Sequence, residues 1–218
     1  MIARVANGSP RVGITGVGAY APERVLTNAD VAQMVETSDA WIVERTGIRE
    51  RHVAEPDEAT SDVAVPAARE ALERAGVAAE GVDLVLVATA SPATIEQDLH
   101  YLQMNGREVY RFATRAMVSS AEQLLAECGL TVADAAVYVP RQANLRIIDH
   151  AARHLGLAPE KVWINVDRCG NTSSASVPIC LHEALADGTL RAGQTVLMSA
   201  VEAGLSWGSA LLVWGDAR

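Results

Sequence analysis

The sequence predicts an α/β fold in which layers of helices cover β-sheets. Half of the 218 residues are hydrophobic but only 4% are aromatic. The core therefore has to be built from aliphatic side chains, which favours layered α/β packing over an aromatic-rich all-β domain. Short apolar segments rich in β-branched residues also alternate along the chain with longer segments of helical spacing. Such alternation is typical of the α/β class.

Two strands and two helices are predicted in the N-terminal part of the chain. The predicted strands are residues 11–18 and 82–89, and the predicted helices are residues 39–46 and 62–75. Ser38 can cap the start of the first helix and Gly47 can end it, because Ser accepts hydrogen bonds from free N–H groups and Gly adopts positive φ. The second helix is rich in Ala and Glu and ends before Gly76.

A glycine-rich string lies inside the first predicted strand, at residues 13–18. Its order is G-x-x-G-x-G, whereas a dinucleotide-binding turn has G-x-G-x-x-G between a strand and a helix, with an acidic residue at a fixed distance. The string therefore predicts close packing of the backbone rather than a nucleotide site.

The C-terminal part contains a denser series of elements. The predicted helices are residues 109–128, a helix that begins after Asn144, and residues 173–187; the predicted strands are residues 136–139, 161–165, 195–201 and 205–214. Gly129 ends the first of these helices. Asn144 is a favourable N-cap, and the apolar residues after it recur at helical spacing, which places them on one face.

Composition and charge argue against several classes of protein. The net charge is −9 and the basic residues are scattered, which argues against nucleic acid as a partner. No apolar run reaches the length of a membrane span, and residues 1–8 lack the apolar core of a signal peptide. Three cysteines without paired spacing argue against disulfides, and Cys180 and His182 point to opposite sides of their predicted helix, so we expect no metal site. We expect a soluble cytoplasmic protein.

Several strings of sequence, taken together, resemble one known family. They cover nearly the whole chain: residues 27–30, 37–51, 59–62, 104–109, 139–146, 170–176 and 203–208. In this order they are similar to the β-ketoacyl-acyl carrier protein synthase III family of the thiolase-like fold. The resemblance implies a layered α-β-α-β-α architecture of two similar halves. It assigns residues 1–94 to a truncated N-terminal half and residues 95–218 to the C-terminal half.

The same resemblance implies that an internal segment is missing. In the family, the strand that matches residues 82–89 is followed by a long segment with the nucleophilic cysteine, further strands and the dimer-forming region. Here the chain passes directly to residues 96–102, which resemble sequence from beyond that segment. The resemblance implies a loss on the order of a hundred residues, with the join near residues 93–96. The remaining N-terminal sheet would have an open edge, so we expect a homo-oligomer or a synthase partner.

Most of the catalytic residues that the resemblance implies are absent. In the family, a cysteine thiolate takes the acyl group from acyl-CoA and malonyl-acyl carrier protein decarboxylates to attack it. A histidine and an asparagine donate hydrogen bonds to the thioester oxygen. Here Asn171 matches the asparagine, Arg141 stands at the histidine position, and the cysteine belongs to the missing segment. A permanently charged guanidinium cannot reproduce a neutral imidazole, so the resemblance implies a chain without condensing activity.

Two roles are open for Arg141. Its guanidinium can bind an oxyanion or a carboxylate of a ligand, or it can form a salt bridge to a nearby carboxylate of the protein. Glu202 stands where the family usually has glycine, which puts a carboxylate near the acyl pocket. A pair between Arg141 and Glu202 would plug the site.

The resemblance implies that the coenzyme A entrance is better preserved. In the family a tryptophan stacks on the adenine, threonine and arginine side chains line the nucleotide end, and an asparagine binds the pantetheine arm. The matching residues are Thr37, Trp41, Arg45, Thr46 and Asn144. An indole suits a purine and a guanidinium suits a phosphate. The alternative is that Trp41 is a core residue and that Arg45, Arg49 and Arg51 form a solvated basic strip.

Three functions remain open from the sequence. The first is an inactive relative of the enzymes that initiate fatty acid or polyketide synthesis. The second is a non-catalytic subunit that binds coenzyme A, or that uses the coenzyme A entrance or Arg49 and Arg51 to dock an acidic acyl carrier protein or a full-length synthase. The third is an acyltransferase that uses a partner's cysteine or Cys169, which lies just ahead of a predicted helix start. The expected ligands are acyl-CoA and acyl carrier protein, with no cofactor beyond the coenzyme A thioester as substrate.

Overall fold

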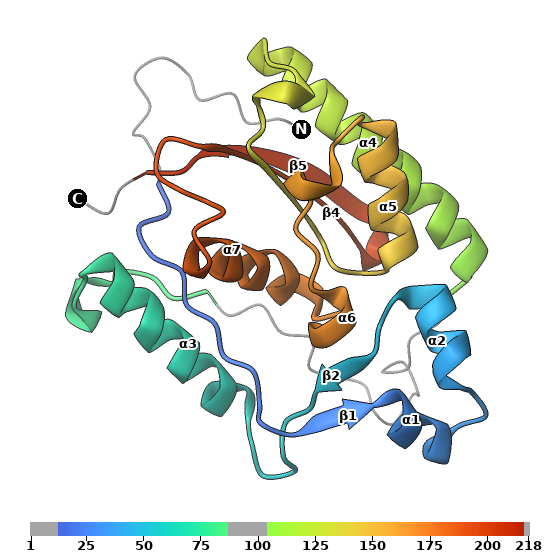
Figure 1. Ribbon diagram of the computed structural model, residues 1–218. Coiled ribbons are helices and arrows are strands. Elements are labelled where there is room, and N and C mark those ends of the chain that lie inside the picture. Colours follow the sequence, from blue (N-terminus) through green and yellow to red (C-terminus); the bar gives the residue numbers. More distant parts are fainter. Residues whose placement is uncertain (1–12, 87–103, 216–218) are drawn as a thin grey trace.

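A three-stranded sheet forms the centre of the C-terminal part of the molecule. The computed structural model describes residues 13–86 and 104–215, and within them β3 (Val137–Pro140), β4 (Thr195–Glu202) and β5 (Ser206–Val213) pair in the order β3-β4-β5 (Figure 1). The first two strands are parallel and the last two antiparallel. All four residues of β3 are buried, as expected for a parallel strand that is covered on both faces.

Helices cover both faces of this sheet. On one face, α4 (Gly106–Cys128) and the end of α5 (Leu145–His154) pack against Tyr138 and Leu197. On the other face, α7 (Ser176–Ala186) packs against Val137, Val139 and Val196. Because successive side chains of a strand point to opposite faces, this alternation gives the sheet a core on each side. The predicted α/β class is confirmed.

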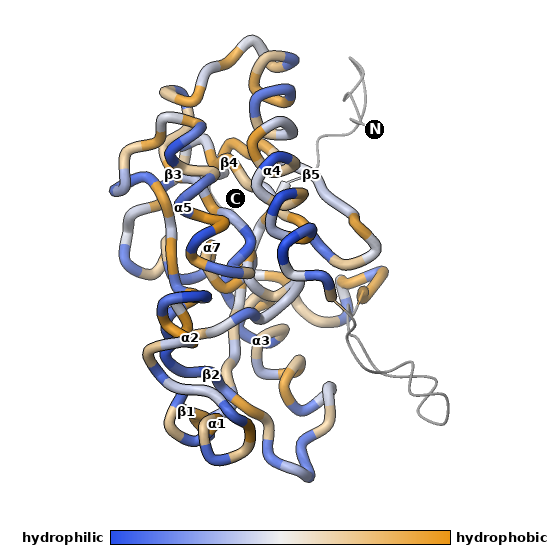
Figure 2. The backbone as a smooth tube through the Cα atoms, turned by 90° about the vertical axis from the view of Figure 1, so that its right-hand side faces the viewer, coloured by the Kyte–Doolittle hydropathy of each residue, from blue (hydrophilic) through white to orange (hydrophobic). Residues whose placement is uncertain are grey.

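The N-terminal part is built from smaller elements. These are β1 (Val25–Thr27), α1 (Asn28–Met34), α2 (Asp39–Thr46), β2 (Glu50–His52) and α3 (Thr60–Ala75). β1 pairs antiparallel with β2. The amide of the buried Asn28 donates to Asp39 Oδ1 and to Ile48 O, both at 2.8 Å. Figure 2 shows α1, β1 and β2 together at the end of the molecule away from β4 and α4.

The N-terminal and C-terminal parts meet where α2 and β2 approach α5 and the short helix α6 (Val166–Cys169). Arg49 N donates to Asp167 O at 2.9 Å, and Asn144 Nδ2 donates to Arg45 O at 2.8 Å. Gly47, which ends α2 with φ +80°, leaves room for Leu145, because a Cβ at this position would lie 2.5 Å from the Leu145 Cβ. Glycine is therefore required here both for its φ and for its size.

The helix predictions and the strand predictions at 136–139, 195–201 and 205–214 are confirmed in their main lines. The helix at 39–46 has its predicted Ser38 and Gly47 caps, and Asn144 caps α5. The helices predicted at 62–75 and 109–128 begin two and three residues earlier than expected. The predicted helix at 173–187 divides into a 3₁₀ turn (Ser173–Ala175) followed by α7.

Three strand predictions are wrong over the residues that the structure describes. Residues 13–18 and 82–86 form no strand, and residues 161–165 contribute only a bridge between Tyr138 and Val162. Leu84, Val85 and Leu86 are 72%, 73% and 85% exposed. A strand forms only beside a hydrogen-bonding neighbour, and no neighbour is described for these residues. The remaining residues of the first two predictions, and the join near 93–96, lie outside the described residues.

The glycine string packs closely, as predicted, although it does not form a strand. A Cβ at Gly16 would lie 2.3 Å from Ala71 O, and one at Gly18 would lie 2.1 Å from Ala67 O. Both carbonyls belong to α3, so these two glycines allow the backbone to run along that helix. No helix within the described ranges has the length and apolar character that crossing a membrane requires.

Candidate functional site

Arg141 and Glu202 lie at the edge of the sheet where the parallel strands β3 and β4 both end. Arg141 follows the last residue of β3, and Glu202 is the last residue of β4. In α/β proteins, ligands bind at the carboxyl ends of parallel strands. The Arg141 Nε donates to Glu202 Oε1, so Arg141 takes the second of the two roles that the sequence left open, a salt bridge to a carboxylate of the protein. The Arg141 side chain is only 10% exposed, whereas that of Glu202 is 37% exposed.

Buried hydrogen bonds hold the backbone at this edge. The Arg141 N–H donates to Ser199 O at 2.9 Å and extends the pairing of β3 with β4. The hydroxyl groups of Tyr138 and Ser199 are hydrogen-bonded to each other across the same two strands. Tyr138 is fully buried, and this burial raises the pKa of its phenol to about 12. The base of the site is therefore rigid and uncharged.

Gln142, the next residue, positions the segment that leads to Asn171. Its side chain is fully buried. Its Oε1 accepts from the backbone N–H groups of Asn165 and Val166 at 3.0 and 3.1 Å, and its Nε2 donates to Pro140 O and Trp163 O at 2.8 and 3.1 Å. One amide thus satisfies four backbone groups and fixes the start of α6.

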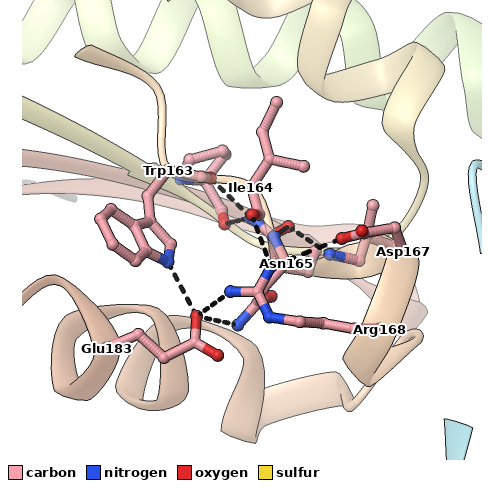
Figure 3. Close-up of polar contacts among 9 residues, drawn as sticks. Trp163, Ile164, Asn165, Asp167, Arg168 and Glu183 are labelled. Atoms are coloured by element: carbon pink, nitrogen blue, oxygen red, sulfur yellow. Dashed lines mark hydrogen bonds and ion pairs between the residues drawn. The ribbon is translucent and has the colours of Figure 1, made fainter. Parts of the chain in front are cut away.

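Glu183 of α7 holds the same segment from the other side. Its Oε2 accepts from Trp163 Nε1 at 2.9 Å, Asn165 Nδ2 at 2.9 Å and Arg168 Nη2 at 2.7 Å (Figure 3). The sequence analysis missed the roles of both Gln142 and Glu183. For Gln142 the sequence held one signal, because this residue lies inside the family-like string at 139–146. For Glu183 it held no signal, because the residues that Glu183 binds lie 15 to 20 positions away in the chain.

Asn171 is engaged with its own loop rather than with Arg141. Asn171 is exposed, and its Oδ1 accepts from the N–H of Ser173 at 3.3 Å, so the side chain turns back on its own loop. No hydrogen bond between Asn171 and Arg141 is found among the described residues. Gly170 precedes Asn171 with φ +72°, and a Cβ there would lie 3.2 Å from the Arg51 Cβ, which fixes the path of the loop.

Cys169 is placed differently from the prediction. It is the last residue of α6 and lies ahead of the 3₁₀ turn at Ser173–Ala175 that leads into α7, so it does precede a helix start as predicted but stands at the carboxyl end of another helix. Burial raises the pKa of the Cys169 thiol, and the negative charge of Glu183 raises it further. The carbonyl end of a helix also disfavours a thiolate. Cys180 is buried, which raises the pKa of its thiol as well, and Cys128 is exposed.

A hollow of about 540 Å³ lies beside Trp41, between α1 and α2. Its lining residues are Val31, Val35, Glu36, Thr37, Ser38, Trp41 and Ile42. Trp41 is 55% exposed, so the interpretation of Trp41 as a core residue is wrong. The Arg45 guanidinium carbon lies 5.8 Å from the centre of the indole ring. The Thr37 hydroxyl is buried and has no partner among the described residues.

Thr46 and Asn144 have structural partners instead. The Thr46 hydroxyl donates to Ile42 O at 2.6 Å and accepts from Ile48 N at 3.1 Å. Asn144 caps α5 through its Oδ1 and joins α5 to α2 through its Nδ2. Of the five residues implied for coenzyme A binding, only Thr37, Trp41 and Arg45 therefore present side chains free of a protein hydrogen bond in the described part of the chain.

Arg51 is not part of a free basic strip. Its Nη1 donates to Leu26 O at 3.2 Å and its Nη2 donates to Asn28 Oδ1 at 2.9 Å. These bonds tie β2 to β1 and to the start of α1. The guanidinium is consequently a structural group, and a docking surface for an acidic partner cannot rely on it.

Comparison with known proteins gives a consistent result. Residues 125–214 match the family described as the C-terminal domain of 3-oxoacyl-[acyl-carrier-protein] synthase III. The β-ketoacyl-[acyl-carrier-protein] synthase III of Symbiobacterium thermophilum is 36% identical over 324 positions, covering 94% of this chain and 98% of the relative. That of Roseiflexus is 32% identical over 321 positions, covering 92% and 98%.

Solved structures agree with the sequence relatives. The synthase III of Aquifex aeolicus has a TM-score of 0.87 at 27% identity, covering 93% of this chain and 99% of that one. The Thermus thermophilus enzyme has a TM-score of 0.83 at 32% identity, covering 94% and 100%. This likeness confirms the predicted thiolase-like architecture.

The length of the sequence match shows how this chain differs in length from its relatives. The match to the Symbiobacterium relative spans 324 positions, over a hundred more than the 218 residues of this chain. It nevertheless covers 98% of the relative and 94% of this chain. The additional positions of the relative therefore fall inside the match, as expected for an internal deletion.

Proposed function

Because the chain belongs to the β-ketoacyl-[acyl-carrier-protein] synthase III family, we propose that it is a relative of the enzymes that initiate fatty acid or polyketide synthesis. Those enzymes condense acyl-CoA with malonyl-acyl carrier protein. We propose that this chain does not itself catalyse the condensation. The ion pair between Arg141 and Glu202 carries this proposal. It fills the position where the reaction needs a neutral hydrogen-bond donor with a free N–H.

The electrostatics of the pair support the loss of activity. Condensation develops negative charge on a thioester oxygen, and donors in the site must be free to meet it. The Arg141 Nε is already bonded to a carboxylate, and the Glu202 charge would repel a developing oxyanion. Asn171 is exposed and engaged with its own turn, so two converging donors are not available.

The nucleophile is the second missing part. We place the nucleophilic cysteine of the family in the absent internal segment. Of the cysteines that remain, Cys180 is buried and Cys169 has a raised thiol pKa, while Cys128 is exposed at the end of α4. A thiolate is the reactive form in acyl transfer, so these environments do not favour replacement of the lost nucleophile.

Intact-mass spectrometry before and after incubation with acetyl-CoA tests the proposal. The expected result is the mass of the 218-residue chain with no adduct, under conditions in which the Symbiobacterium relative gains one acetyl group. A single acetyl group on this chain would overturn the proposal, and peptide mapping would locate the nucleophile. If the acetyl group lies on Cys169 and the Cys169→Ser variant stays unmodified, the acyltransferase function is correct instead.

The second candidate function is a non-catalytic subunit that binds coenzyme A, an acyl carrier protein or a full-length synthase. The hollow beside Trp41 favours it, because the hollow is lined by an exposed indole and by a buried hydroxyl that has no partner among the described residues. The Arg45 guanidinium lies over the same indole ring. An aromatic face with an adjacent cation suits a purine nucleotide. This candidate requires no catalytic group.

Tryptophan fluorescence distinguishes the two candidates. Trp207 is the matched control, because its exposure of 56% is close to the 55% of Trp41. Trp207 does not line the hollow and packs edge-on against Phe112, with 5.2 Å between the ring centres. If the chain binds coenzyme A, titration should quench fluorescence in the wild type and in Trp207→Phe but not in Trp41→Phe. Equal quenching in both variants, or none in the wild type, would rule out binding at this hollow.

A further inference from the structure

Arg141 has more hydrogen-bond donors than its ion pair uses. A guanidinium carries five N–H groups in a planar fork. Only the Nε of Arg141 has an acceptor, and neither Nη1 nor Nη2 is hydrogen-bonded to any described residue. The side chain is nine-tenths buried, but neither nitrogen is among the buried side-chain atoms that lack a partner in the described part of the chain, so both lie at the surface of the site. Four N–H groups of the guanidinium are thus open to a ligand.

The partner of Arg141 is the more exposed member of the pair. Glu202 is 37% exposed and is followed by the turn Ala203–Leu205, in which Gly204 and Leu205 both have positive φ. Its carboxylate can therefore reach solvent by rotating about its own side chain, without disturbing β4. The Arg141 guanidinium is the more enclosed of the two groups, since its side chain is only 10% exposed.

From this asymmetry we propose that Arg141 is a binding site for small organic carboxylates and that Glu202 occupies it when no ligand is present. An incoming carboxylate would displace the Glu202 carboxylate into solvent and bind both a terminal nitrogen and Nε in the bidentate geometry that arginine prefers. The class of ligand is a small anion with a planar carboxylate, because a carboxylate matches the geometry of the guanidinium fork. The inference concerns binding alone and does not depend on whether the chain condenses acyl groups.

Substitution of Glu202 provides the test, with succinate as the probe. The binding of succinate is measured by isothermal titration calorimetry at constant ionic strength. Because Glu202→Gln removes the competing charge and keeps the size of the side chain, succinate should bind about tenfold more tightly than to the wild type. The uncharged diamide, succinamide, should bind to neither protein.

The double variant Arg141→Gln/Glu202→Gln is the matched control, since it has the same overall charge as the wild type and no buried unpaired cation. It should show no succinate binding. Equal affinity in Glu202→Gln and in the double variant would overturn the proposal, because binding would then not involve Arg141.

Glu202→Gln leaves Arg141 without its carboxylate, and a second variant, Glu202→Asp, tests the proposal if Glu202→Gln does not fold. Glu202→Asp keeps the charge but shortens the side chain by one methylene, which weakens the competing contact. Its succinate affinity should lie between those of the wild type and Glu202→Gln. An affinity for succinate unchanged from the wild type in this folded variant would also contradict the proposal. The acetyl-CoA mass experiment is independent of these measurements, so failure of one inference is distinguishable from failure of the other.

Discussion

Tyr138 links β3 to β4 through a hydroxyl that water does not reach, and this makes its ionisation a probe of folding. Its pKa is about 12 in the folded protein against 10 in an exposed phenol. Between these pH values the unfolded chain loses the proton and the folded chain keeps it, so the unfolded state binds fewer protons. The free energy of unfolding therefore falls as the pH rises from 10 to 12, by about 2–3 kcal/mol from this group.

Urea unfolding at pH 9 and pH 11 checks this prediction. The wild type should lose more stability over this interval than Tyr138→Phe, which has no phenol to ionise at this position. The variant itself should be less stable at pH 9 by about 1–3 kcal/mol, because the Ser199 hydroxyl then lacks its partner. The same loss between the two pH values in both proteins would show that Tyr138 does not set the alkaline limit.

The reactivity of Cys169 is the second prediction at the scale of single residues. Because burial and Glu183 raise its thiol pKa, iodoacetamide at pH 7.5 should label the exposed Cys128 well before Cys169. Labelling of Cys169 should accelerate when the pH is raised to 9.5. Peptide mass spectrometry measures both rates, and faster labelling of Cys169 than of Cys128 at pH 7.5 would indicate an activated thiol and favour the acyltransferase function.

At the scale of secondary-structure elements, Gly47 and Gly76 form a natural pair for measuring the junction of α2 with α5. Both end a helix with positive φ, at +80° and +63°. A Cβ at Gly47 would collide with Leu145, whereas a Cβ at Gly76 would meet nothing within 4 Å. We expect Gly76→Ala to cost about 1–2 kcal/mol of unfolding free energy, the cost of a side chain in the left-handed region.

Gly47→Ala should cost more, by at least about 1 kcal/mol, because it adds steric overlap to the same backbone strain. Thermal or urea unfolding of the two variants gives the difference, which belongs to the contact between α2 and α5. Equal losses of unfolding free energy in the two variants would mean that α5 can move away from α2 with little loss of stability. The N-terminal and C-terminal parts of the chain would then be weakly joined.

The same elements show which parts of the fold the sequence could predict. Helix ends depend on neighbouring residues, so Ser38, Gly47 and Asn144 were correctly identified as caps. The short helix α1 was missed, although Thr27 and Asp30 form its capping box, because Asp rather than Glu or Gln completes the box. Residues 82–86 have the composition of a strand, but pairing depends on strands elsewhere in the chain, which local sequence cannot report.

The candidate site also has features that the sequence indicates and features that depend on residues far apart in the chain. The pair of Arg141 with Glu202 was one of two possibilities that the sequence offered, because the family pattern placed two unusual residues at one site. The structural engagement of Asn144 with Arg45 was not predicted, since these residues are 99 positions apart. The convergence on Glu183 depends on the approach of α7 to residues 163–168, and no periodicity in either segment encodes it.

At the scale of the whole molecule, the internal deletion leaves apolar surface exposed. Leu84, Val85 and Leu86 are largely solvent-exposed, and β5 is an edge strand without a charged residue. Such surfaces promote association between copies of a chain. We predict oligomers in sedimentation velocity at micromolar concentration, and a shift toward monomer in the Leu86→Glu variant.

Met34 provides the control for this experiment, because it is also exposed, at 66%, but lies on α1 away from residues 84–86. Met34→Glu adds the same charge and should leave the distribution of oligomers unchanged. If both variants dissociate equally, net charge rather than the apolar segment controls association. A monomeric wild type would contradict the prediction.

The order of strands in the central sheet also has a consequence for the time course of folding. β4 and β5 are joined by a three-residue turn, so their pairing is local and closes a short loop. β3 pairs with β4 only when the connection between them closes into a loop. This connection is residues 141–194 and contains α5, α6 and α7. Closing a long loop has an entropic barrier that a hairpin does not have. The hairpin of β4 and β5 should thus form early, and the docking of β3, which carries Arg141 at its end, should set the rate at which the site is assembled.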